Sequence, residues 1–208
     1  MHVTVMRSAL ESDRPLSCAI DGSGESLSGP GLYIEHIWRL NNRRFIKQHT
    51  MIDLDNQRVV SFAITLEKPG DAKMFVPLVK GALLVGANVQ RVSADSAYDT
   101  KCNWSYMDGS GIEFCPNLKE SKKDCWGPDE RKALASLDEA FGKELAHRMT
   151  GYNSRWLVEV FFSIFKRLYG EHIGNRLFPM MVISMNYRYV LYDIHRDFMI
   201  EARKEVLI

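Results

Sequence analysis

Two short apolar segments that each end in an aspartate constrain the fold of this chain more than any other feature. Leu16 to Asp21 and Val89 to Asp95 both have the pattern of a short buried strand. Gly22-Ser23-Gly24 follows the first segment, so we predict that this strand ends at Asp21 and that a loop begins there. In open α/β sheets, ligands bind outside the carboxyl ends of the strands. The two aspartates are therefore candidates for one site.

The remaining segments predict a mixed sheet flanked by helices. Residues 44–54 and 59–66 alternate apolar with polar residues, which is typical of a hairpin, and Asp53 and Asp55 are interpreted as turn formers. One helix is expected from 71 to 85, with Asp71 as N-cap. A turn at 96–99 leads into a second helix that reaches about residue 107, and a strand is expected at 112–116. From Asp129 onward the pattern is helical. This order is the one expected of a ribonuclease H-like core with a helical C-terminal part.

Length and composition are those of one ordinary globular domain. The chain has 208 residues, of which 46% are hydrophobic and 25% are charged. We expect a loose lead-in at residues 1–14 and a single domain at 15–208. No apolar run is long enough for a membrane span, and no secretory signal is recognisable. The irregular spacing of Cys18, Cys102, Cys115 and Cys125 does not indicate a zinc site.

The charge distribution is more informative than the net charge of +1, which by itself does not indicate a nucleic-acid-binding protein. Basic residues are concentrated in two regions, although such runs are usually solvated faces. The members are Arg39, Arg43, Arg44 and Lys47 in the first region, and Lys143, Arg148, Arg155, Lys166, Arg167 and Arg176 in the second.

One polar stripe follows the helical segment after residue 151. On a helix, Tyr152, Arg155, Glu159 and Lys166 fall within a sector roughly 60° wide, while aromatic and aliphatic residues cover the remaining face. An acid among so many apolar residues requires compensation, either from Arg155 or from a cation. Taken alone, the stripe is also consistent with a salt bridge on a solvated helix edge.

Together, Asp21, Asp95 and Glu159 favour a divalent metal site. Three carboxylates brought together repel one another unless a cation neutralises them. A small number of hard oxygen ligands suits Mg²⁺ or Mn²⁺. Two such ions can activate a water or a 3′-hydroxyl and stabilise the leaving oxygen of an in-line phosphoryl transfer. The basic residues beside Glu159 would then bind the phosphodiester backbone.

At this point the sequence resembles a known family. The pattern Tyr-x₂-Arg-x₃-Glu-x₆-Lys, at Tyr152, Arg155, Glu159 and Lys166, resembles the signature of insertion-sequence transposases of the DDE type. The segment from Ala94 to Asp99 is similar to the family's strand end around its second catalytic acid. The segment from Ala19 to Ser23 resembles that around the first. The resemblance extends from about Cys18 to Tyr192.

The resemblance implies a ribonuclease H-like fold, two Mg²⁺ ions, and strand cleavage and transfer at the ends of a mobile element. It implies that Asp21, Asp95 and Glu159 are catalytic and metal-binding. Asp95 is preferred over Asp99 because Asp99 lies past the strand end. Trp156 is interpreted as a core residue. The DNA-binding residues are expected to be Tyr152, which could instead cap the helix, Arg155, Lys166, Arg43 and Arg44.

The resemblance has one departure and leaves two alternatives. Family members carry an N-terminal helical DNA-binding region, whereas 20 residues precede Asp21 here. We therefore expect duplex DNA as partner, together with a separate N-terminal DNA-binding segment and a homodimer, in the cytoplasm of a prokaryote at the nucleoid. The alternatives are a ribonuclease H-like nuclease that does not transpose and a truncated, inactive DNA-binding relic.

Overall fold

The computed structural model describes residues 3–7, 14–27, 45–66, 69–119, 126–175 and 177–206. Arg43 and Arg44, which were assigned to DNA binding from the sequence, lie outside these residues. The described elements are, in order, β1 (Val3–Val5), β2 (Leu16–Leu27), β3 (Phe45–Asp53), β4 (Val59–Leu66), η2 (Asp71–Met74), α2 (Phe75–Leu84), β5 (Val89–Ala94), η3 (Ser96–Tyr98), α3 (Lys101–Met107), β6 (Glu113–Pro116), α4 (Asp129–Phe141), α5 (Lys143–Met149), η5 (Tyr152–Arg155), α6 (Trp156–Tyr169), β7 (His172–Ile173) and α7 (Phe178–Val206).

The described strands form one mixed sheet in the order β1-β4-β3-β2-β5-β6, and β7 pairs with β2 outside this path. Strands β2, β5 and β6 are parallel, whereas β3 and β4 form the expected antiparallel hairpin. At its turn, Asp53 accepts hydrogen bonds from the backbone N–H groups of Asp55 and Asn56, both at 3.3 Å. The predicted fold class, a ribonuclease H-like mixed sheet flanked by helices with a helical C-terminal part, is confirmed.

Strand β2 is longer than the sequence predicted. The expected loop at Gly22-Ser23-Gly24 is wrong, because the strand continues through these residues to Leu27. Its backbone pairs with β3 along this whole extension, down to Ser26 opposite Phe45. Strand β5, by contrast, ends opposite Ile20. Asp21 therefore lies in the middle of a strand, at the level where the parallel neighbour of that strand ends.

Two short strands occupy places where the sequence predicted none. Strand β1 lies within the segment expected to be a loose lead-in, and it pairs with β4 in the sheet. Strand β7 lies within the C-terminal part expected to be helical, and it pairs with the last residues of β2. Two or three residues are too few to show strand alternation, so their pairing partners determine their conformation. The sheet includes residues 3–5, which precede the predicted start of the domain at residue 15. That start remains a prediction.

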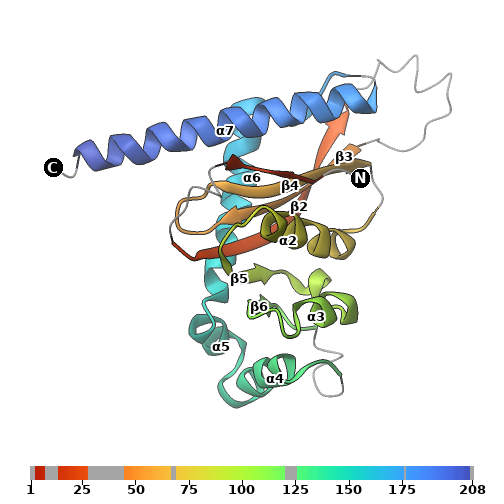
Figure 1. Cartoon of the computed structure of the whole chain (residues 1–208), viewed down its shortest axis with the longest axis vertical. Coiled ribbons are helices and arrows are strands. Elements are labelled where there is room, and N and C mark those ends of the chain that lie inside the picture. The colour runs from red at the N-terminus through yellow and green to blue at the C-terminus, as the bar shows by residue number, and fades with distance from the viewer. Residues whose placement is uncertain are drawn as a thin grey trace.

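Helices cover both faces of the sheet, and each face has its own hydrophobic core. Cys18 and Ile20 belong to the core that α2 and α3 cover, whereas Ala19 between them belongs to the core of α6 and α7. This alternation is the period of two expected of a strand buried on both faces. Figure 1 shows α2 in front of the sheet and α6 behind it. The side chain of Asp21 consequently lies on the α6 side.

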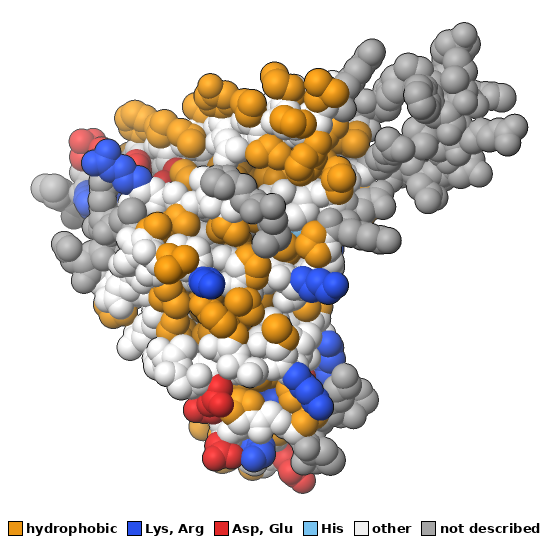
Figure 2. Space-filling model, turned by 45° about the vertical axis from the view of Figure 1, so that its right-hand side comes forward, with side chains coloured by type: hydrophobic (Ala, Val, Ile, Leu, Met, Phe, Trp, Pro, Cys, Tyr) orange, Lys and Arg blue, Asp and Glu red, His pale blue; other side chains and the backbone are white. Residues whose placement is uncertain are grey.

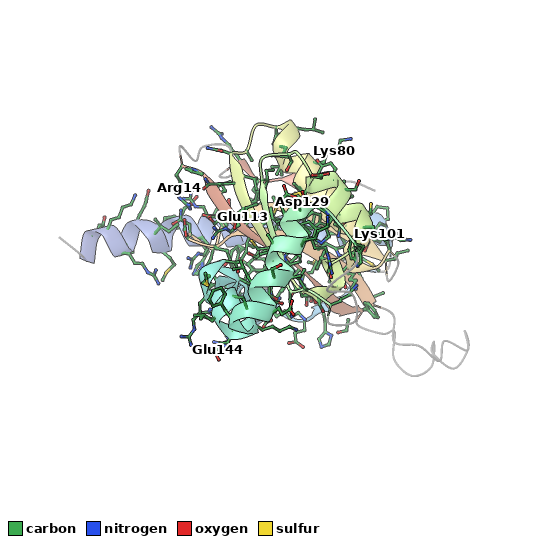
Figure 3. The ribbon with its side chains drawn as sticks, turned by 90° about the horizontal axis from the view of Figure 1, so that it is seen from below. Arg14, Lys80, Lys101, Glu113, Asp129 and Glu144 are labelled. Carbon is green, nitrogen blue, oxygen red and sulfur yellow. The ribbon has the colours of Figure 1, made fainter. Side chains whose placement is uncertain are left out.

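A short helical region links the edge of the sheet to α6. Helices α4 and α5 pack together beyond β6, and Figure 3 shows them from below, with Asp129 and Glu144 labelled. Gly151 then adopts a φ of 69°, which favours glycine. Its turn starts the 3₁₀ segment η5, so Tyr152 to Arg155 precede α6 instead of belonging to the same α-helix. Within the described residues, no helix combines the length and apolarity needed to cross a membrane.

Candidate active site

Asp21 on β2 and Asp95, just after β5, occupy adjacent positions. Ile20 pairs with Ala94 in the parallel register of β2 and β5. The residue after Ile20 is Asp21, and the residue after Ala94 is Asp95. Neighbouring strands lie about 4.8 Å apart, which places the two residues side by side. Asp95 accepts a hydrogen bond of 2.7 Å from the backbone N–H of Ala97 and thereby caps η3. The structure thus brings these two sequence-predicted acids together.

Burial and neighbouring charge make Asp21 costly to ionise. Burial raises the pKa of Asp21 to about 6, although the Gly22 backbone N–H and the Arg155 guanidinium oppose this rise. The negative charges of Asp95 and Asp71 contribute further to the increase. A cation close to this carboxylate would favour its ionised form.

Arg155 connects Asp21 to Glu159. Its Nη1 donates to Asp21 Oδ2 at 3.4 Å, and its Nη2 donates to Glu159 Oε1 at 2.5 Å. Both nitrogens belong to one rigid guanidinium, so the two carboxylates lie within about 8 Å of each other. The Glu159 side chain is 59% exposed, whereas the Arg155 side chain is 17% exposed. The positive charge between these two acids is therefore supplied by the protein itself.

The acids match a divalent cation in chemistry but are not gathered around one point. Asp21, Asp95 and Glu159 offer the hard oxygen donors that Mg²⁺ prefers. The buried hydroxyl of Tyr98 has no hydrogen-bond partner among the described residues, and burial, followed by the charges of the nearby aspartates, raises its pKa well above the usual value. In the described part of the chain, however, no three acid, histidine or cysteine side chains are close enough to hold a metal ion. Arg155 occupies the space between two of the acids.

Asp99, the alternative to Asp95, is a structural residue. Its carboxylate is buried and accepts hydrogen bonds of 2.9 Å from Arg131 Nε and Nη2 and from Trp104 Nε1. The backbone N–H of Lys119 adds a bond of 3.0 Å. Burial raises the pKa of Asp99, but these hydrogen bonds outweigh it, and the pKa is lowered overall. Asp99 therefore connects η3, α3, α4 and the chain after β6, while Asp95 faces Asp21.

Asp71 is a further acid beside the candidate site, although the sequence predicted it to be a helix N-cap. The N-cap of η2 is Gly70, and the Asp71 side chain instead pairs with Lys47 at 2.7 Å and with His49 at 3.3 Å. These partners, with His49 contributing most, lower the pKa of Asp71 to about 2. A Cβ at Gly22 would lie 2.4 Å from Asp71 Oδ1, so the glycine permits this approach. No sequence pattern marked Asp71 as a neighbour of the site, because the contact depends on the unexpected extension of β2.

The expected DNA-binding residues lie along η5 and α6. Lys166 donates from Nζ to the carbonyl oxygen of Gly24 at 3.1 Å, next to the extended part of β2. Tyr152 is partly buried, and its ring centroid lies 4.2 Å from that of His147. The interpretation of Trp156 as a core residue is wrong: its side chain is 56% exposed at the first position of α6. Aromatic side chains at such positions can stack on bases.

A family model and several solved structures are similar to parts of this chain. The chain is similar to a chain of a simian T-cell lymphotropic virus intasome, with 10% identity and a TM-score of 0.36 over 74% of this chain and 50% of that one. It is also similar to the large terminase nuclease of a thermophilic phage, with 15% identity and a TM-score of 0.24 over 53% and 49%. The chain thus spans about half the length of these solved chains. No curated protein matches it. The family model described as "Transposase DDE domain" matches residues 16–174.

Proposed function

The chain belongs to the family of transposase DDE domains, and on this premise we propose that it is the catalytic domain of an insertion-sequence transposase. The proposed reaction is cleavage and transfer of DNA strands at the ends of the element, with Mg²⁺ or Mn²⁺. The signature Tyr-x₂-Arg-x₃-Glu-x₆-Lys places it, in our proposal, in the group of transposases that carry this pattern.

One observation carries the proposal: Asp21 and Asp95 lie side by side, and Glu159 is one guanidinium away from Asp21. The three acids come from β2, from the end of β5 and from α6, which are far apart in sequence. Acids brought close together from three separate elements are unfavourable for stability alone. Their convergence therefore supports a function that uses their combined charge.

In the proposed site, Asp21, Asp95 and Glu159 hold two divalent ions. Bound ions of this kind supply a nucleophilic oxygen at neutral pH and stabilise the charge on the leaving oxygen. Arg155 has to leave Asp21 before Glu159 can approach the aspartates, because its guanidinium now lies between them. A DNA phosphate is a suitable new partner for Arg155, since planar guanidinium groups bind phosphates through two parallel hydrogen bonds.

The remaining roles concern DNA binding. We propose that Lys166 and Tyr152, with Arg155, bind the DNA backbone along α6, and that Arg43 and Arg44 contribute further contacts. Duplex DNA is the proposed substrate, bound by a second copy of the chain and by a separate N-terminal DNA-binding segment as well. The proposed location is the prokaryotic cytoplasm, at the nucleoid.

The arrangement of Arg155 favours one alternative, an inactive DNA-binding relic. An internal arginine offsets part of the negative charge of the acids, so the site needs a metal ion less. If the arginine never leaves, the chain keeps the fold and loses catalysis. The two proposals differ in whether metal binds to the folded protein, which can be measured without any DNA.

The test combines metal binding with DNA cleavage. We expect Mg²⁺ or Mn²⁺ to raise the melting temperature of the purified chain, because a ligand that binds only the folded state stabilises it by about 2.7 kcal/mol at a hundred times its dissociation constant. Asp95→Asn should remove most of this gain and lower the nicking of duplexes that carry the element ends by at least about 100-fold.

The matched control is Asp108→Asn, an exposed aspartate at the end of α3. It should change neither the metal response nor the cleavage. Equal responses of the wild type and Asp95→Asn to metal, with no nicking by either, would favour the relic.

A further inference from the structure

Helix α7 carries apolar residues on two opposite faces. The inner face packs against the sheet through buried side chains, namely Met181, Met185, Tyr189 and Tyr192. Tyr189 stacks on Phe62 of β4 with a centroid distance of 3.8 Å, which fixes the rotation of the helix. With its inner side defined in this way, the opposite side of α7 necessarily points away from the sheet.

The opposite side is also apolar, and we name it the α7 outer face. Its members are Leu177, just before the helix, and Met180, Ile183, Tyr187, Val190, Leu191, Ile194 and Phe198. Each is at least 45% exposed, and Leu177, Tyr187 and Phe198 are close to 68% exposed. From residue 177 to residue 194, every exposed position of this segment is apolar, Pro179 included. Figure 2 shows hydrophobic side chains gathered along the top of the molecule, where Figure 1 places α7.

The size of the α7 outer face is that of a protein interface. The exposed parts of its side chains correspond to more than four whole large side chains. At about 150–200 Å² for each, this amounts to roughly 800 Å² of apolar surface. Monomers seldom expose a continuous apolar patch of more than about 300–600 Å². A stable interface needs about 800 Å² from each partner, which is about the whole area of this face.

The spacing of the residues indicates that the partner is a second copy of the chain. Counted from Tyr187, apolar residues occur four positions before and after it, at Ile183 and Leu191, and seven positions before and after it, at Met180 and Ile194. Such a pattern is nearly the same when it is read in either direction. A face of this kind matches itself when two helices cross antiparallel about a two-fold axis, which is the geometry of an isologous interface. Spacings of three and four are also those of packed helix seams.

A lipid surface fits the α7 outer face less well. Helices that lie on membranes combine their apolar face with Lys and Arg residues along its border. Arg188, on the neighbouring side of α7, donates instead to the carbonyl oxygens of Gly170 and His172 at 3.3 and 2.8 Å. It thereby holds β7 against the helix and is not directed toward a lipid headgroup.

We propose that the α7 outer face is a homodimer interface in which two copies pair their α7 helices antiparallel about an axis at Tyr187. Ile183 of one copy then packs against Leu191 of the other, and Met180 against Ile194. The interface does not depend on the catalytic proposal, because it involves no residue of the candidate active site.

The first test is the mass of the full chain in solution, measured by sedimentation equilibrium over a concentration series. The wild type should be a dimer that dissociates on dilution. Tyr187→Glu should raise the dimer dissociation constant by at least about tenfold, because it places two like charges at the axis. The control is Leu84→Glu, on α2, since Leu84 is 75% exposed but lies on the other side of the sheet. It should leave the dimer unchanged.

The second test determines the orientation of the helices. In a background that carries Cys102→Ser and Cys125→Ser, the double variant Ile183→Cys, Leu191→Cys should form a disulfide-linked dimer on mild oxidation. The single variant Ile183→Cys should not, because antiparallel helices keep the two copies of this position apart. A wild type that is monomeric up to about 100 µM, or a dimer that Tyr187→Glu does not weaken while far-UV circular dichroism shows an intact fold, would overturn the proposal. Linkage of the single variant would overturn the antiparallel arrangement.

Discussion

Replacing Arg155 by methionine should lower the unfolding free energy of the metal-free protein and increase its stabilisation by Mg²⁺. The ion pair of Arg155 with Glu159 is exposed on the Glu159 side and contributes about 0.5 kcal/mol. The contact with Asp21 is better protected, since the side chains of Arg155 and Asp21 are 17% and 22% exposed, but it is long at 3.4 Å. We expect a total loss of about 1–2 kcal/mol in unfolding free energy, to which the unpaired charge of Asp21 contributes. For a chain of this size, this corresponds to a fall of roughly 3–6 °C in melting temperature.

The same substitution should increase the affinity of the protein for Mg²⁺. In the wild type, a cation that binds Asp21 competes with a guanidinium already in place. Arg155→Met removes this competition, so the apparent affinity for Mg²⁺ should rise about five- to tenfold, because each 1.4 kcal/mol corresponds to a factor of ten. Thermal unfolding at increasing Mg²⁺ concentration measures both effects in one experiment, since ligand binding raises the melting temperature by mass action.

Arg148 offers a matched control for this experiment. It pairs with Glu144 at 2.6 Å in the same i,i+4 geometry, and both side chains are well exposed on α5. Arg148→Met should lower stability by at most about 0.5 kcal/mol and leave the Mg²⁺ response unchanged. The reasoning fails if Arg155→Met has the stability and the metal response of Arg148→Met.

Three further results are expected. Lys166→Gln should reduce the salt dependence of DNA binding, measured by fluorescence anisotropy, by about one unit of slope. The control is Lys80→Gln, at an exposed residue of α2 that is labelled in Figure 3, and it should leave the slope unchanged. Equal slopes for the two variants would exclude a phosphate contact at Lys166. Gly22→Ala should lower stability by about 1–3 kcal/mol in denaturant unfolding, because its Cβ would lie 2.4 Å from Asp71 Oδ1; an unchanged midpoint would contradict this contact. Asp99→Asn should cost about 3–5 kcal/mol near neutral pH, because it removes the carboxylate charge that balances the buried guanidinium of Arg131. Since the pKa of Asp99 is lowered in the folded state, its contribution is present above about pH 4 and is lost as the pH falls through the folded pKa, so unfolding curves of the wild type and the variant should converge in acid.

Local sequence determined much of the fold because several segments specify their own conformation. The β3–β4 hairpin follows from alternation on both sides of a turn that Asp53 stabilises with its own side chain. Strand β5 and the cap at Asp95 follow from an apolar run that ends in a residue able to accept a hydrogen bond from the next turn. In such segments the signal lies within a few neighbouring residues, and it needs no tertiary partner.

Other features depended on partners that the sequence does not display. Gly22-Ser23-Gly24 has the composition of a loop, yet β3 continues opposite it and supplies backbone hydrogen bonds. Asp71 is an acceptable N-cap in sequence, and its pairing with Lys47 and His49 arises only because β2 continues beneath η2. The sequence left open whether Arg155 or a cation compensates the charge of Glu159. The structure shows Arg155 bound to Glu159 and Asp21.

The extension of β2 also determines how the basic residues lie relative to the acids. Strand β2 carries Asp21 opposite Arg155, and three residues further on its Gly24 carbonyl accepts from Lys166. Three strand residues span about 10 Å, whereas the eleven residues from Arg155 to Lys166 span roughly 17 Å, and the long side chains of Arg155 and Lys166 bridge this difference. Strand and helix therefore run alongside each other, held by one polar contact at each end. If DNA follows this direction, as proposed, Lys166 lies about three base-pair steps along the duplex axis from the acids. A loop after Asp21 would leave Lys166 without this fixed position, so the misjudged strand extension is the element that gives the basic stripe its geometry.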